Sequence, residues 1–145
     1  MGLTSCSLCP NGTFSTASGA LASCTACPQG AYASTTASTT CTPCLPGTWA
    51  LPSANPNSSA VCILCAQGQY STQLQATSPC TLLCPTGTYS TGSTGGASSS
   101  ICLQCLPGTY SNTQAAQSCA QCSIGFYSAY GMSSCQFCAA GLYIP

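Results

Sequence analysis

Sixteen cysteines are the residues of this 145-residue chain whose type and spacing could do chemistry. They fall in eight close pairs, of which seven read C-x-x-C and one is longer by a single residue. Closely paired thiols can act as redox centres, bind zinc as thiolates or form structural disulfides. The pairs are Cys6/Cys9, Cys24/Cys27, Cys41/Cys44, Cys62/Cys65, Cys80/Cys84, Cys102/Cys105, Cys119/Cys122 and Cys135/Cys138.

Catalysis is excluded by what accompanies these cysteines. The chain contains no Asp, Glu, Lys, Arg or His. General acid–base catalysis relies mainly on those residue types, and a nucleophilic Cys or Ser needs a neighbouring base or cation to activate it. Phosphate groups could not be neutralised either. We therefore expect no catalytic residue, no cofactor and no nucleic-acid partner.

Zinc binding and disulfide formation are the two main interpretations that remain for the cysteine pairs. The distance between successive pairs formally fits a zinc knuckle. However, four thiolates around zinc carry net negative charge, and no Lys or Arg is present to offset it. No βαβ pattern surrounds any pair, which disfavours thioredoxin-like redox chemistry. A cysteine content above roughly 8–10 % is typical of a disulfide scaffold, so we favour disulfides over metal binding or metal storage.

The elements that position the cysteines repeat with them. All eight units fit C-x(2,3)-C-x-x-G-x-[FYW], so each pair is followed by a glycine and then an aromatic residue. The glycine favours a turn because it tolerates positive φ, and we expect the aromatic residue to pack against the disulfides. The turn glycines are Gly12, Gly30, Gly47, Gly68, Gly87, Gly108, Gly125 and Gly141. The packing aromatics are Phe14, Tyr32, Trp49, Tyr70, Tyr89, Tyr110, Tyr127 and Tyr143.

The repeat predicts small disulfide-rich units in an elongated array of short β-hairpins and turns, with almost no helix and no globular core. Leu45-Pro46-Gly47 and Leu106-Pro107-Gly108 suit type II turns, whereas Pro10-Asn11-Gly12, Pro28-Gln29-Gly30 and Pro85-Thr86-Gly87 suit type I. After the glycine we expect a short strand whose Ser or Thr residues face water. The predicted repeats are residues 1–23, 24–40, 41–61, 62–79, 80–101, 102–118, 119–134 and a partial repeat at 135–145. They are numbered units 1 to 8 below.

This unit resembles the ephrin-receptor-like cysteine-rich repeat and is similar to the first half of tumour-necrosis-factor-receptor modules, with Cys24 to Tyr32, Cys80 to Ser90 and Cys102 to Ser111 as the best matches. The resemblance implies that the second cysteine of each unit bonds the first cysteine of the next, which leaves Cys6 and Cys138 unpaired or joined to a neighbouring chain segment. Eight rings within the pairs are the alternative. The implied pairs are Cys9–Cys24, Cys27–Cys41, Cys44–Cys62, Cys65–Cys80, Cys84–Cys102, Cys105–Cys119 and Cys122–Cys135.

The composition also bears on location and function. Long arrays of this repeat occur in protist and algal surface proteins and flagellar hairs (mastigonemes), which this charge-free, Ser/Thr-rich chain resembles. We expect a secreted or cell-surface glycoprotein that self-associates into a filament or adjoins further repeats of a longer chain; a receptor or adhesion module is the alternative. The start lacks a basic signal-peptide region, which favours a processed chain or a fragment, and no stretch approaches the roughly 20 apolar residues of a membrane span. The glycan candidates are Asn11 and Asn57 in N-linked sequons, and Ser34, Thr35, Thr36, Ser38, Thr39, Thr40, Ser98, Ser99 and Ser100 for O-linked sugars.

Overall fold

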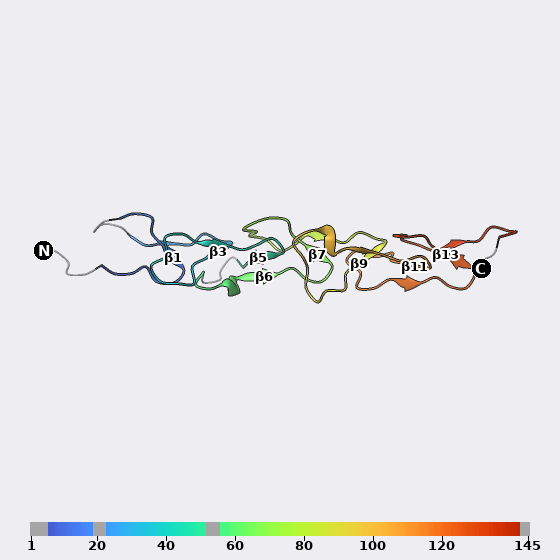
Figure 1. The fold of residues 1–145 in the computed structure, drawn as a ribbon, viewed down its shortest axis with the longest axis horizontal. Helices are drawn as coiled ribbons and strands as arrows, with labels where there is room; N and C mark the ends of the chain where they lie inside the picture. The colour runs from blue at the N-terminus through green and yellow to red at the C-terminus, as the bar shows by residue number, and fades with distance from the viewer. Residues whose placement is uncertain (1–5, 19–22, 52–55, 143–145) are drawn as a thin grey trace. The chain divides into compact units, whose positions relative to one another are not determined.

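A computed structural model describes residues 6–18, 23–51 and 56–142. In these ranges the chain forms seven two-stranded antiparallel sheets, each a hairpin, with two 3-10 turns and no α-helix (Figure 1). The paired strands are β1 (Thr13–Phe14) with β2 (Thr25–Ala26), β3 (Ala31–Tyr32) with β4 (Thr42–Pro43), β5 (Thr48–Ala50) with β6 (Cys62–Leu64), β7 (Gln69–Tyr70) with β8 (Leu82–Leu83), β9 (Thr88–Tyr89) with β10 (Leu103–Gln104), β11 (Thr109–Tyr110) with β12 (Ala120–Gln121), and β13 (Phe126–Tyr127) with β14 (Gln136–Phe137). The 3-10 turns are η1 (Ser59–Val61) and η2 (Ser99–Ile101).

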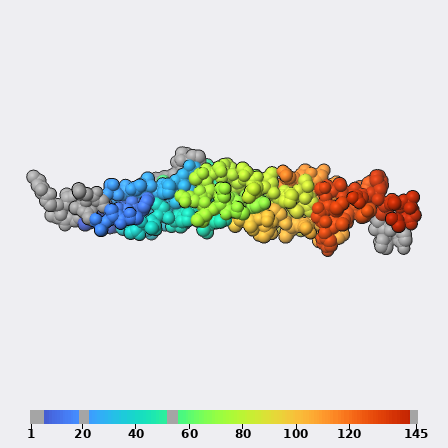
Figure 2. Space-filling model, turned by 90° about the horizontal axis from the view of Figure 1, so that it is seen from above, coloured from blue at the N-terminus to red at the C-terminus, as the bar shows by residue number. Residues whose placement is uncertain are grey.

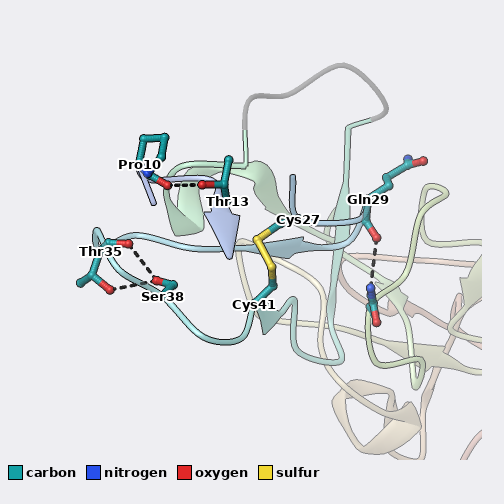
Figure 3. Close-up of a disulfide and its surroundings, with 8 residues drawn as sticks. Pro10, Thr13, Cys27, Gln29, Thr35, Ser38 and Cys41 are labelled. Atoms are coloured by element: carbon teal, nitrogen blue, oxygen red, sulfur yellow. Dashed lines mark hydrogen bonds between the residues drawn. A yellow bond between two sulfur atoms is a disulfide. The ribbon is translucent and has the colours of Figure 1, made fainter. Parts of the chain in front are cut away.

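Each hairpin joins the strand after a turn glycine to residues at the next cysteine pair. In the second hairpin, Ala31 lies opposite Pro43 and Tyr32 opposite Thr42. The N–H of Cys44 donates to the carbonyl of Gly30 at 2.7 Å and extends the ladder. A disulfide between Cys27 and Cys41 closes the same loop, with the Cα atoms 5.8 Å apart (Figure 3). The hairpins therefore cross the predicted repeat boundaries, which remain a description of the sequence period.

Seven disulfides connect successive units. Every bond joins the second cysteine of one unit to the first cysteine of the next, at Cα separations from 5.3 to 5.8 Å. Cys6 and Cys138 are free thiols, the first exposed and the second half-buried. The bonded pairs are the ones that the resemblance implies: Cys9–Cys24, Cys27–Cys41, Cys44–Cys62, Cys65–Cys80, Cys84–Cys102, Cys105–Cys119 and Cys122–Cys135.

All eight turns are of one kind, so the type I expectation for three of them is wrong. The N–H of Thr13 donates to the carbonyl of Pro10 at 3.1 Å, which makes Pro10 the first residue of the turn and Gly12 the third. Gly12 has φ +84°, a value that a type I turn does not allow at its third position. The proline in these three turns thus precedes the central pair instead of occupying it. The corresponding bond and a positive φ recur at every turn glycine, including Gly30 and Gly87.

A threonine side chain reinforces four of these turns. Where Thr follows the glycine, its hydroxyl donates to the same carbonyl that accepts the turn's backbone bond. Thr13 Oγ1 lies 2.7 Å from the oxygen of Pro10 (Figure 3), and Thr48, Thr88 and Thr109 make the same bond at 2.6, 2.6 and 2.7 Å. One carbonyl thereby receives two donors, which favours the turn in the absence of a packed core.

The interior is made of sulfur and small side chains. The largest side chains with almost no exposure are Cys44, Cys65, Cys84, Cys105 and Ser90. The expectation that Ser after the aromatic faces water is wrong, because the residue at that position is 7 % exposed or less in units 2 to 7. The aromatics of units 1 to 6 are only half-buried, and Tyr127 of unit 7 is 44 % exposed. Tyr32 packs against the small cluster of Cys44, Ala50 and Val61, whereas Tyr143 lies outside the described residues.

The chain divides into two compact bodies. The N-terminal body holds residues 1–63 with 73–79, and the C-terminal body holds residues 64–72 with 80–145. Within the N-terminal body, segments of units 1 to 3, blue to cyan in Figures 1 and 2, lie against one another. The helical elements of the described chain are three-residue turns, and none of them could cross a membrane.

Candidate functional site

The contacts that join one repeat to the next are the most regular feature of the molecule, and we call them the inter-repeat joint. Its first part is the residue after the aromatic. In units 1 to 6 the N–H of this residue donates to a loop carbonyl of the next unit, as from Ser15 to Ser38 at 3.1 Å and from Ser90 to Ala116 at 2.9 Å. The small side chain is needed here because the next unit's loop covers it. The six donors are Ser15, Ala33, Ala50, Ser71, Ser90 and Ser111.

The second part of the joint is the carbonyl of the second cysteine in units 1 and 3 to 6. A loop N–H of the following unit donates to it, as from Ala37 to Cys9 and from Ala115 to Cys84, both at 2.8 Å. Three non-glycine residues at this loop position have left-handed backbone, with φ +58° at Ala37, +59° at Gln75 and +54° at Ala115. Residues other than glycine rarely adopt this region, so the loop is held in an unfavoured shape by its contact with the preceding unit.

The third part of the joint is a contact between a turn glycine and a loop residue of the unit two repeats later. A Cβ built on Gly30 would lie 2.6 Å from Cγ of Gln75, and one built on Gly68 would lie 2.7 Å from Cα of Ala115. At Gly87 the backbone oxygen of Gly131 leaves no room for a side chain. Gly30, Gly68 and Gly87 are therefore required both by their positive φ and by the loop residue packed on each of them from two units further on.

Side-chain amides add to the joint in the N-terminal body. Gln29, the second residue of its turn, donates through Nε2 to the carbonyl of Ala50 at 3.2 Å and to that of Thr77 at 3.0 Å. The carbonyl of Gln29 accepts from Nε2 of Gln75 at 3.3 Å (Figure 3). Gln67 makes the corresponding contact in the C-terminal body, where its Nε2 donates to the carbonyl of Ser90 at 2.8 Å. These amides bridge units without any charged group.

The chemistry available to this arrangement is covalent closure and main-chain pairing. Fourteen of the sixteen cysteines are consumed in the seven disulfides. In the described ranges no group of three or more His, Cys, Asp or Glu could hold a metal ion. The joint presents backbone N–H groups, carbonyls and glycine surfaces in register, which suits the stacking of one repeat on another.

The predicted glycan sites lie on the outside of these units. Asn11 is exposed at the second position of its turn, and Asn57 is exposed just before η1. Thr36 and Thr40 are exposed on the loop of unit 2, as are Ser34, Thr35 and Thr39. The hydroxyl of the half-buried Ser38 donates to the carbonyl of Thr35 at 2.8 Å (Figure 3).

In unit 5 the candidate serines belong to the start of η2. Ser98 is half-buried and its hydroxyl accepts from the N–H of Ser100 at 3.4 Å, which caps the turn. Ser99 and Ser100 are exposed. Accessibility therefore ranks Ser99, Thr36 and Thr40 above Ser98 and Ser38 as acceptors of O-linked sugars.

Sequence reasoning missed two parts of the joint. The residue after the aromatic is Ser or Ala in every unit from 1 to 7, and this restriction to small residues could have indicated a covered position. The left-handed loop residue gives no such signal, because its type changes from Ala37 to Gln75 to Gly131 at variable distances from the cysteines. It is set by the shape of the joint and not by a side-chain preference.

The comparison with protein families adds one finding to this geometry. A family model described as tyrosine-protein kinase ephrin type A/B receptor-like matches residues 1–39. Residues 1–39 are thus similar to an ephrin-receptor-like cysteine-rich module. No curated protein matches the chain. Ephrin-receptor-like modules of this disulfide-rich kind are typical of non-catalytic extracellular domains, and the seven disulfides are typical of an oxidising compartment.

Proposed function

We propose that this protein is a structural subunit of an extracellular, glycosylated filament, appendage or matrix. The observation that carries the proposal is the inter-repeat joint, which stacks near-identical units through main-chain atoms in a chain that has no charged side chain at all. A net charge near zero favours association over repulsion. Sugars on the exposed Asn, Ser and Thr residues supply the solubility that charges give to other surfaces.

The test is to recover the native protein and locate it. We expect antibody labelling on the outside of intact cells, in an assembled structure, and an intact mass above that of the 14.4 kDa polypeptide. Treatment with a peptide-N-glycosidase should remove sugar from Asn57 and Asn11, and β-elimination should remove it from the loop of unit 2. An unmodified mass in an unassembled, intracellular pool would contradict the proposal.

A receptor or adhesion module is the second candidate, and two observations favour it. Residues 1–39 match a family of receptor modules. The N-terminal body also carries a groove of about 330 Å³, lined among others by Phe14, Pro28, Pro43 and Leu74. A glycan array or a cell-surface binding assay with the whole chain separates the two candidates. Binding that is lost in Phe14→Ser and kept in Phe137→Ser, which changes an exposed side chain of the C-terminal body, would favour the receptor role.

A further inference from the structure

The turn glycines of the last units are uncovered, whereas earlier ones are covered by a later unit. Gly30, Gly68 and Gly87 are buried, each beneath a loop residue from two units further on. Gly108, Gly125 and Gly141 are exposed, with positive φ of +81°, +88° and +90°, and a Cβ built on any of them meets nothing within 4 Å among the described residues. Unit 8 thus presents the acceptor side of a joint.

The complementary donor side is exposed on units 1 and 2. Ala37 has the same left-handed backbone as Gln75 and Ala115, yet it is exposed, whereas those two residues are half-buried on Gly30 and Gly68. Ser15 is only half-buried, although its counterparts in units 2 to 7 are buried. Units 1 and 2 therefore carry the loop surface that covers a glycine elsewhere in the molecule, without a glycine beneath it.

We propose that a second copy of this chain docks its units 1 and 2 on unit 8, so that copies join head to tail through the same joint that links the repeats. In this arrangement Ala37 of the second copy covers Gly141, as Gln75 covers Gly30. The Ser15 carbonyl of the second copy accepts from the N–H of Gly141, as the Ala33 carbonyl accepts from Gly12 at 2.7 Å. The proposal deepens the structural role proposed above by naming the partner.

The two free thiols are placed to pair in the same way between two copies. Cys138 is the second cysteine of unit 8 and Cys6 is the first cysteine of unit 1, the combination that every disulfide in the chain joins. With glutathione disulfide as oxidant, the Cys138 thiolate attacks one sulfur and releases a glutathione thiolate. The Cys6 thiolate of the second copy then attacks the Cys138 sulfur of this mixed disulfide and releases the second glutathione. Two protein thiols are oxidised, and one glutathione disulfide is reduced to two thiols.

A charge-swap experiment on the whole chain tests the docking. Ala140 occupies in unit 8 the turn position of Gln29, and Ala37 corresponds to Gln75, the two glutamines that are hydrogen-bonded within the chain. Both alanines are exposed, and Asp is among the residues that tolerate left-handed backbone, so Ala37→Asp and Ala140→Lys leave the fold intact. Sedimentation velocity over a concentration series, with Cys6 and Cys138 both replaced by serine so that no adduct or disulfide forms, measures the non-covalent association.

We expect the wild-type chain to self-associate and each single variant to associate about tenfold more weakly or worse, because each places an unpaired charge in the interface. The double variant Ala37→Asp with Ala140→Lys should recover to within about threefold of wild type. The like-charge control, Ala37→Asp with Ala140→Asp, should not recover. Full association of the single variants, or a wild-type chain that stays monomeric at about millimolar concentration, would overturn the proposal.

The covalent step has its own readout. Under glutathione disulfide, non-reducing gels should show a ladder of multimers, and chymotryptic mapping should find a Cys138–Cys6 peptide, trypsin being useless without Lys or Arg. Cys138→Ser should abolish the ladder and leave sedimentation unchanged. A ladder built on any other cysteine would overturn the assigned register. Since purified protein suffices, failure here is distinct from failure of the extracellular role, which the glycan and labelling experiments test.

Discussion

At the scale of single residues, a turn glycine can be required for two reasons: its positive φ and the lack of room for a Cβ. Two of the glycines allow the energetic effects of these requirements to be measured separately. Gly87 and Gly108 have nearly the same backbone, with φ +79° and +81°. The oxygen of Gly131 lies where a Cβ on Gly87 would be, whereas a Cβ on Gly108 would meet nothing within 4 Å. Alanine at either site pays for the left-handed backbone, and only alanine at Gly87 also disturbs the joint.

We therefore expect Gly108→Ala to lower the free energy of unfolding by about 1–2 kcal/mol and Gly87→Ala to lower it by a further ~1–3 kcal/mol from overpacking. Chemical denaturation with the disulfides intact, followed by near-ultraviolet circular dichroism, gives both values. Equal losses at the two sites would show that the loop of unit 7 does not press on Gly87.

The sequence predicts the residues that are fixed by covalent or backbone rules and misses those fixed by contact between units. Gly-x-aromatic after each cysteine pair is enough to place the turns, since positive φ selects glycine. The sequence could not show that Pro10 precedes the central turn pair, because Pro suits more than one turn position. Nor could it show that Ser90 is buried, since burial there comes from the loop of the next unit.

At the scale of the hairpin, two or three residues in each strand are too few for a hairpin to be stable on its own in water. Isolated two-stranded hairpins are marginal even when longer. Each one here is closed by a disulfide over a loop of 13 to 18 residues. Such loops stabilise by roughly 3 kcal/mol each in the chain-entropy model. The stability of the hairpins therefore comes from disulfides, whereas that of larger domains comes from a core of aliphatic side chains.

Removing one disulfide should consequently unfold one hairpin and loosen its neighbours. We expect the paired substitution Cys84→Ala with Cys102→Ala to lower the free energy of unfolding more than Cys122→Ala with Cys135→Ala, although each pair removes one disulfide. Cys84 is fully buried and its carbonyl accepts from Ala115, whereas Cys122 is half-buried. In the first variant, hydrogen exchange should show a loss of amide protection that spreads into unit 6. In the second variant the loss should stay within the affected hairpin. Identical patterns would contradict the conclusion that the joint stabilises neighbouring units.

At the scale of the whole molecule, the absence of Asp, Glu and His side chains has a thermodynamic consequence. Stability changes with pH only when the folded and unfolded states bind different numbers of protons. Asp, Glu and His, which govern acid unfolding in most proteins, are absent from the chain. The two states therefore bind almost the same number of protons over the acidic and neutral range.

We expect the thermal midpoint of the intact-disulfide protein to be constant within about 2 °C from about pH 4 to about pH 7, with little dependence on salt. Differential scanning calorimetry at several pH values checks this. Treatment with a thiol reductant should abolish the transition at any of those pH values, and a metal chelator should leave it unchanged. A strong acid transition would point to charged groups added after synthesis, such as acidic sugars.

The joint also bears on how such a protein changes over generations. Because the contacts that recur from unit to unit run through main-chain N–H groups, carbonyls and turn glycines, one unit can follow another with few side chains that must match across the joint. In-frame duplication or loss of a unit's coding segment would leave every remaining junction usable. The number of units can then vary between related genes. The length of the protein can therefore change by whole repeats without the evolution of a new contact surface.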